Sequence, residues 1–102
     1  MAEFMKIPHT VVIILEAKPT KEAALKQALV KVCEPSRSEK TCIEYRLHQN
    51  QNNPAQFILY ENWESKEAHQ DQFNKPYVID LIAEIHDLLA RPYQAYFAHE
   101  FE

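Results

Sequence analysis

Hydrophobic residues in the first third of the chain follow two different spacings. An uninterrupted apolar run at 11–15 is rich in β-branched residues, which is typical of a buried strand, and we place that strand at 9–17. Apolar residues then recur at the spacing of one helical face: Leu25, Ala28, Leu29 and Val32. This pattern predicts a helix that is capped by Thr20 and that ends or kinks near Pro35.

Alternating apolar and polar residues predict two further strands, at 42–49 and 56–63. We expect the first to direct three side chains to one face: Ile43, Tyr45 and Leu47. The second directs alternate side chains to one face, namely Phe57, Leu59, Glu61 and Trp63. Asn62 points the opposite way. Segment 50–54 predicts a hairpin, because its asparagines tolerate left-handed backbone as glycine does.

The C-terminal part predicts two helices and a strand. Ser65 caps a short polar helix that runs through about Phe73, and Pro76 begins a longer one. The longer helix has one apolar face: Val78, Leu81, Ile82, Ile85 and Leu89. A last strand follows at 93–101.

The order β-α-β-β-α-β predicts a ferredoxin-like α+β fold with a four-stranded antiparallel sheet, in one domain at 5–102. Helices would cover one face of that sheet, whereas the strands carry large apolar groups on both faces. The simplest cover for the other face is a second copy of the chain, so we expect a homodimer.

Composition excludes several classes of function. The chain has 102 residues, 46% of them hydrophobic, and its net charge of -4 gives no basic surface for nucleic acid. No apolar run approaches the roughly 20 residues that cross a bilayer, so we expect no membrane association and a cytoplasmic location. Residues 1–4 lack the features of a signal peptide, and we interpret them as a cloning remnant.

Cofactor and metal motifs are also missing from the sequence. The chain has no glycine, which rules out the Gly-rich loops that bind nucleotide phosphates. Its histidines and two cysteines show no metal-ligand spacing, and we expect Cys33 and Cys42 to be reduced thiols. His9 lies near the chain end and receives no role. We therefore expect neither a metal nor a cofactor.

Several short motifs, taken in order, resemble the antibiotic-biosynthesis monooxygenase family. They are Glu34-Pro-Ser-Arg37, Cys42-Ile-Glu-Tyr45, Tyr60-Glu61-Asn-Trp63-Glu-Ser65 and Glu67-Ala68. The resemblance implies a dimeric α+β barrel with a pocket between sheet and helices. Members of this family, which includes small quinol monooxygenases, oxidise aromatic polyketides or hydroquinones without flavin, haem or metal.

The sequence departs from the family pattern at three places. Thr41 stands where the family usually has glycine, and Gln72 stands where it usually has histidine. Tyr77 replaces the histidine of the family's Pro-His-Phe motif, which reads Pro76-Tyr77-Val78 in this chain. The family's haem-degrading relatives use an asparagine on the first strand, which this chain lacks. The resemblance therefore favours a role other than haem degradation.

The candidate site residues surround the end of the third strand. Trp63 offers a surface for a flat substrate, although it could equally be a core residue. Glu61, on the same face, could be a base with a raised pKa or could form an ion pair with Arg37, Arg46 or a helix lysine. Three further candidates share one face of the short polar helix: His69, Gln72 and Phe73. Tyr77 is a further candidate for substrate binding.

These residues and the resemblance together predict a cofactor-independent monooxygenase that oxidises a hydroxylated aromatic or quinol substrate with O2. His69 or Glu61 would accept the phenolic proton, and Gln72 or a tyrosine hydroxyl would stabilise the oxyanion. If His69 is the base, the rate should fall as the pH drops through about 6.5. The alternatives are an isomerase of a small phosphorylated carbonyl compound and a dimeric ligand-binding module without turnover.

Overall fold

The computed structural model describes residues 8–102 of the chain. Its sheet has the strand order β2-β3-β1-β4, and every neighbouring pair is antiparallel. The strands are β1 (His9–Glu16), β2 (Cys42–Asn50), β3 (Asn53–Trp63) and β4 (Gln94–Ala98). The helices are α1 (Glu22–Lys31), α2 (Cys33–Arg37), α3 (Lys66–Asp71) and α4 (Pro76–Ile85). The prediction of a ferredoxin-like α+β fold is confirmed, with a sheet that is not closed within one chain.

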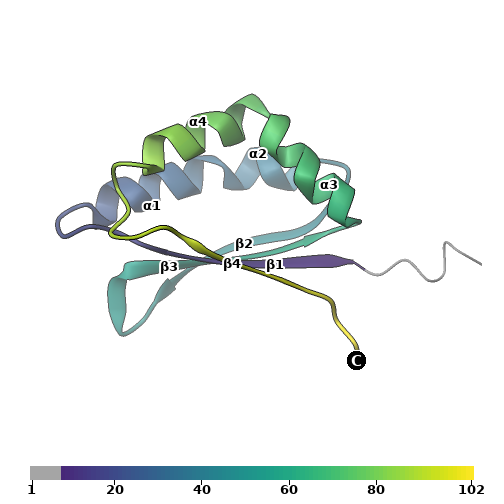
Figure 1. Ribbon diagram of the computed structural model, residues 1–102, viewed down its shortest axis with the longest axis horizontal. Helices are drawn as coiled ribbons and strands as arrows, with labels where there is room; N and C mark the ends of the chain where they lie inside the picture. Colours follow the sequence, from purple (N-terminus) through teal and green to yellow (C-terminus); the bar gives the residue numbers. More distant parts are fainter. Residues whose placement is uncertain (1–7) are drawn as a thin grey trace, which may run out of the picture.

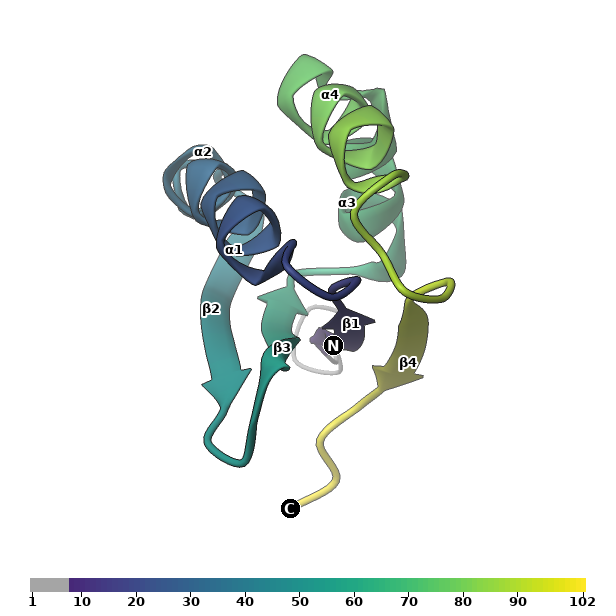
Figure 2. The same ribbon diagram turned by 90° about the vertical axis from the view of Figure 1, so that its left-hand side faces the viewer.

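All four helices cover the same face of the sheet (Figure 1). They form two pairs that lie side by side, α1 with α2 and α3 with α4 (Figure 2). Large side chains at the centre of the core are almost completely buried: Val11, Leu25, Leu29, Phe57 and Trp63. Each contributes about 1.5–3 kcal/mol to folding. Among residues 8–102 no helix lies on the opposite face of the sheet, which we call the helix-free face.

Thr20 is not the cap of α1, which corrects the sequence-based expectation. Its φ is 72°, in the left-handed region, and Lys21 takes the cap position without a side-chain hydrogen bond. Left-handed backbone costs a non-glycine residue roughly 1–2 kcal/mol, which this glycine-free chain accepts at one sharp turn. Ser65, in contrast, caps α3 as predicted and accepts a hydrogen bond from the Ala68 N–H at 3.1 Å.

The predicted hairpin between β2 and β3 is confirmed, but its backbone conformation is different. Among residues 8–102 only Thr20 has a positive φ, so the asparagines of the turn are not left-handed. They act through their side chains instead. Asn50 Oδ1 accepts a hydrogen bond from the Asn52 N–H, and Asn53 Oδ1 accepts one from the Ala55 N–H. These side-chain bonds shape the turn without glycine.

A bulge changes the predicted faces of β2. The register shifts between Cys42 and Glu44, opposite Trp63 and Asn62. One extra residue in a strand shifts the alternation of its side chains, so that residues before the bulge point to the opposite face from the one predicted. As a result Ile43 is 52% exposed, and Cys42 packs against the core instead. The prediction that Ile43 shares a face with Tyr45 is therefore wrong.

The remaining differences concern the ends of elements. The helix predicted to end or kink near Pro35 is divided into α1 and α2, with Pro35 inside α2. α4 ends at Ile85, and the following segment pairs with the end of β1: the Ala90 N–H donates to the Glu16 carbonyl oxygen at 2.8 Å. β4 is shorter than the strand predicted at 93–101. The interpretation of residues 1–4 lies outside the described residues.

Candidate active site

A cavity of about 110 Å³ lies between the sheet and the two helix pairs. Most of its lining is apolar and comes from β1, β3, β4 and α4. The polar side chains of the lining are Ser36, Tyr45, Glu61, His69, Gln72 and Tyr93. Of the candidates from sequence, the cavity brings together Glu61, Trp63, His69, Gln72 and Phe73. A small, mostly apolar cavity with a few grouped polar side chains has the general character of a ligand site.

Glu61 is a buried carboxylate with one hydrogen bond. Its side chain extends from β3 into the cavity and Oε1 accepts from the Trp63 indole N–H at 2.8 Å. Burial raises its pKa to about 7, and the indole hydrogen bond only partly opposes this. At neutral pH the carboxyl group therefore exists in both protonation states.

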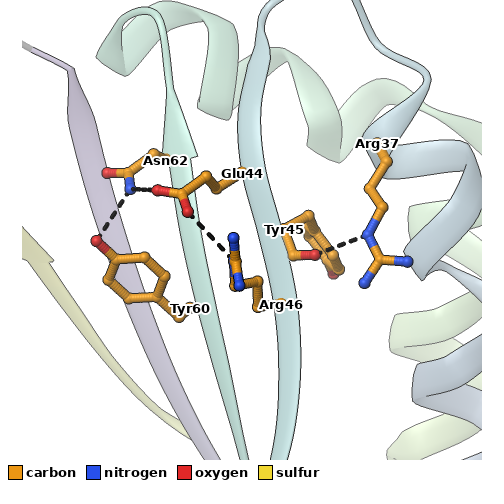
Figure 3. Close-up of polar contacts among 6 residues, drawn as sticks. All are labelled: Arg37, Glu44, Tyr45, Arg46, Tyr60 and Asn62. Carbon is orange, nitrogen blue, oxygen red and sulfur yellow. Dashed lines mark hydrogen bonds and ion pairs between the residues drawn. The ribbon is translucent and has the colours of Figure 1, made fainter.

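Among residues 8–102 Glu61 pairs with neither an arginine nor a lysine, so the ion-pair alternative is wrong. Arg37 donates from Nε to the backbone carbonyl oxygen of Tyr45 at 2.9 Å, and Arg46 donates to Glu44 Oε2 at 3.2 Å (Figure 3). Neither arginine belongs to the cavity lining. The charge of an ionised Glu61 is thus not neutralised by either of them.

His69, on α3, faces Glu61 across the cavity. Its Nε2 lies 4.0 Å from Glu61 Oε1, and the side chain is 7% exposed. Burial lowers the pKa of His69 to about 4, and the nearby His9 adds to this effect. His69 is therefore a neutral imidazole at neutral pH, so the expectation that it titrates near 6.5 does not hold.

Two further rings pack against His69 at this end of the cavity, and sequence reasoning missed both: Phe97, which lines the cavity, and His9, which does not. The His9 ring centroid lies 5.4 Å from that of His69 and 5.4 Å from that of Phe97. Pairing of β1 with both β3 and β4 brings them there, since His9 lies opposite Trp63. Alternation along β1 puts His9 on the same face as Val11, and this pattern was the signal that could have identified His9.

Comparison of the sequence with models of protein families identifies the family of this protein. A sequence model described as antibiotic biosynthesis monooxygenase matches residues 8–84. The chain belongs to this family. The resemblance of its motifs is thereby confirmed at the level of the family.

Relatives of this family member include the uncharacterized protein sll1783 of Synechocystis, which is 33% identical over 81 residues. That match covers 76% of this chain and 53% of the relative, so the chain spans about half of that protein's length. The Mycobacterium tuberculosis protein named "Putative monooxygenase Rv0793" is 26% identical over 88 residues, which is 86% of each chain.

Solved structures confirm the fold of the family. The crystal structure of PA3566 from Pseudomonas aeruginosa superposes with a TM-score of 0.91 at 24% identity and covers 96% of this chain and 98% of that one. The structure of Rv0793 superposes with a TM-score of 0.88 and covers 93% of this chain and 96% of that one. At these identities the superpositions establish the fold alone.

Trp63 in this family member is both a core residue and part of the lining. It is 1% exposed, as expected for a core residue, and it also lines the cavity. Tyr45 packs edge-on against its indole at 6.4 Å between ring centroids. Phe73, in contrast, is 45% exposed where it borders the cavity. Trp63 therefore supports the deep wall and Phe73 the outer part.

Gln72 and Tyr77 stand at two of the family departures and contact each other. Gln72 is 5% exposed and lines the cavity. Tyr77 is not part of the lining: its hydroxyl donates to Gln72 Oε1 at 2.7 Å and lies 3.1 Å from Glu39 Oε2. Any effect of Tyr77 on a ligand would thus pass through Gln72.

Two larger features do not occur within residues 8–102. No three side chains of histidine, cysteine, aspartate or glutamate gather there as a group that could hold a metal ion. In the same part of the chain, no helix is long and apolar enough to cross a bilayer.

Proposed function

We propose that this protein is a monooxygenase that oxidises a hydroxylated aromatic or quinol substrate with O2 and needs no bound cofactor. One observation carries the proposal: Glu61 is a carboxylate buried in an apolar cavity, where it faces the neutral ring of His69 and accepts one hydrogen bond among residues 8–102, from the Trp63 N–H. Membership of the antibiotic biosynthesis monooxygenase family supports the reaction class.

Glu61 is the better of the two candidate bases. Its pKa of about 7 makes the carboxylate a stronger proton acceptor than His69, whose pKa is about 4. A general base works best when its pKa lies near the working pH. Glu61 therefore takes the hydroxyl proton of the substrate, and the aromatic walls hold the resulting anion away from water.

The anion then reacts with oxygen directly. It passes one electron to O2, and the two radicals combine to form a carbon–oxygen bond. The peroxide takes the proton back from Glu61 and loses water. A hydroquinone and O2 become a hydroxyquinone and H2O, so the substrate supplies all four electrons and no separate reductant takes part. The protein binds, deprotonates and excludes water.

The isomerase alternative fits the cavity less well. A phosphorylated substrate needs cationic anchors, and bidentate arginine is the usual one. The lining, as the described residues define it, contains neither arginine nor lysine. Arg37 and Arg46 bond to Tyr45 and Glu44 instead. These contacts favour an uncharged aromatic substrate over a phosphate ester.

A homodimer is part of the same proposal. The helix-free face presents half-buried apolar side chains in the middle of the sheet: Val12, Ile14, Ile58 and Tyr60. A second sheet would cover them and would make the interface apolar. Light scattering at micromolar concentration should give a particle of twice 12.0 kDa, whereas one of 12.0 kDa would contradict the dimer.

The proposed location is the cytoplasm, because the two free cysteines suit a reducing compartment.

The test of the reaction is incorporation of labelled oxygen. The protein is freed of metal with a chelator, its visible spectrum is recorded, and it is supplied with a panel of hydroquinones under ¹⁸O2. A monooxygenase puts one labelled atom into the product and one into water. Binding without oxygen uptake would instead identify a ligand-binding module, and loss of turnover after chelation would contradict cofactor independence.

A further inference from the structure

The side-chain amide of Gln72 is the polar group of the cavity whose orientation is set from outside. Gln72 begins a short 3₁₀ helix, η2 (Gln72–Asn74), which forms the turn between α3 and α4, and its side chain lines the cavity. Its partner, Tyr77, is on α4 and is not in the lining. Behind Tyr77 lies Glu39, in the loop between α2 and β2. The contact thus joins both helix pairs.

One proton is available to two acceptors in this contact. The Tyr77 hydroxyl lies 2.7 Å from Gln72 Oε1 and 3.1 Å from Glu39 Oε2. Burial raises the pKa of Tyr77 to about 12, so the hydroxyl keeps its proton and has one to donate. The shorter bond goes to the Gln72 carbonyl oxygen.

An ion pair reduces the competing attraction of Glu39. Lys75 Nζ lies 3.4 Å from Glu39 Oε1 and 3.7 Å from Asp71 Oδ2. Without a cation, a carboxylate would be the stronger acceptor for the Tyr77 proton. Because Lys75 partly neutralises the charge of Glu39, the Tyr77 hydroxyl proton remains available to Gln72.

The consequence for the cavity follows from the shape of an amide. When Oε1 bonds to Tyr77, the two N–H groups of Gln72 Nε2 point elsewhere. Nε2 has no hydrogen-bond partner among residues 8–102, yet no buried side-chain nitrogen or oxygen of this region lacks a partner. Nε2 therefore keeps some accessible surface, and the cavity that Gln72 lines is where this surface can lie.

We propose that Tyr77 is a positioning residue: its hydroxyl, held between Glu39 and Gln72, turns the Gln72 side-chain N–H into the cavity to donate to the oxygen of a bound phenolate. This inference rests on the proposed function, because it assumes a phenolic ligand. It assigns to Gln72 a donor that strengthens as charge develops on the substrate oxygen.

The experiment measures the acid dissociation of 4-nitrophenol bound to the protein, from the absorbance of its phenolate. This probe is too electron-poor to be consumed by oxygen. We expect Gln72→Leu to lower the acid dissociation constant of the bound probe about tenfold, because one hydrogen bond to the anion is lost. Tyr77→Phe, which keeps the ring, should have a similar effect, and the double variant should add nothing further.

A matched control is Tyr60→Phe, which removes a hydroxyl bonded to Asn62 on the other face of the sheet and should leave the bound probe unchanged. Thermal unfolding by circular dichroism verifies that each variant is folded. An unchanged probe in Tyr77→Phe, or additive effects of the two substitutions, would overturn the proposal. A rise in acid dissociation would also overturn it, since the Gln72 oxygen would then face the cavity.

The probe separates this inference from the proposed function. If wild-type protein binds no 4-nitrophenol at millimolar concentration, the cavity is not a phenol site and both proposals fail. If it binds with the expected dependence on Tyr77 but incorporates no labelled oxygen into quinols, only the monooxygenase activity is contradicted.

Discussion

The two faces of the sheet each hold a buried polar side chain from β3, and these neighbours in sequence differ in how many bonds they make. Asn62, on the helix-free face, donates to Glu44 Oε1 at 2.8 Å and to the Tyr60 hydroxyl at 3.0 Å (Figure 3). It also accepts a hydrogen bond from the Thr10 hydroxyl. Glu61, on the helix-covered face, accepts one bond.

The two carboxylates differ in the same way. Glu44 uses both oxygens, one for Asn62 and one for Arg46 at 3.2 Å, so its charge is shared with a cation. Glu61 has no such cation, and burial shifts its pKa to about 7. Fully bonded polar groups stabilise and specify a structure, whereas an under-bonded buried carboxylate is available for chemistry.

The largest expected effect is on turnover. Glu61→Gln should lower the rate of oxygen uptake about 10²–10⁴-fold, since the amide retains the shape and can still accept from the Trp63 N–H but takes no proton. The matched control, Glu44→Gln, changes the same atoms on the other face and should leave the rate within about threefold. Similar losses in both variants would show that Glu61 acts only through the integrity of the sheet.

The next effect is on stability. Trp63→Ala should destabilise the protein by about 3–5 kcal/mol in urea unfolding, because the indole is completely buried and its loss leaves a void. Trp63→Phe retains much of the packing and should cost less. It also removes the N–H that bonds to Glu61, so the pKa of Glu61 should rise. A cost below about 1 kcal/mol for Trp63→Ala would contradict its place in the core.

The sequence predicted most of this arrangement for a physical reason. Alternation along a strand is strict where there is no bulge, so β3 alone indicated that Glu61 and Trp63 share one face and Asn62 takes the other. Helical spacing likewise placed His69, Gln72 and Phe73 together. Local periodicity therefore grouped five of the residues that line the cavity: Glu61, Trp63, His69, Gln72 and Phe73.

What the sequence did not predict depends on pairing between distant segments. The bulge at Cys42 exists only against β3, and the position of His9 beside His69 depends on the register of β1. The bond from Tyr77 to Gln72 depends on how α4 leaves the turn. The pKa of about 7 at Glu61 arises from burial that no single segment provides.

The pH dependence of stability should separate Glu61 from His69. Glu61 binds its proton more tightly in the folded protein. Its contribution to the free energy of unfolding therefore falls as the pH rises from 4.5, the ordinary pKa of a glutamate, to about 7. His69 binds its proton less tightly when folded, so its contribution falls as the pH drops from 6.5 to about 4. Between about pH 4.5 and 6.5 the two contributions to the free energy of unfolding change with pH in opposite directions, so they largely cancel in the wild type.

Single substitutions should reveal each slope. In Glu61→Gln, the free energy of unfolding should increase with pH by up to about 3 kcal/mol between pH 4 and 6.5. In His69→Gln, it should decrease by a similar amount between pH 4.5 and 7. Urea unfolding at each pH measures both. A pH-independent difference between either variant and the wild type would contradict the shifted pKa of that residue.

The smallest expected effect belongs to the helix-free face. Asn62→Ala removes three hydrogen bonds at once, yet Glu44 and Tyr60 are only half-buried in one chain, so water can replace the lost partner and the cost should be about 1 kcal/mol. If a second sheet covers this face, water is excluded and the cost should grow with protein concentration as the dimer forms. Urea unfolding at two concentrations a hundredfold apart tests this. A cost that is the same at both would contradict burial of Asn62 in a dimer interface, and oxygen uptake should be unaffected because the side chain points away from the cavity.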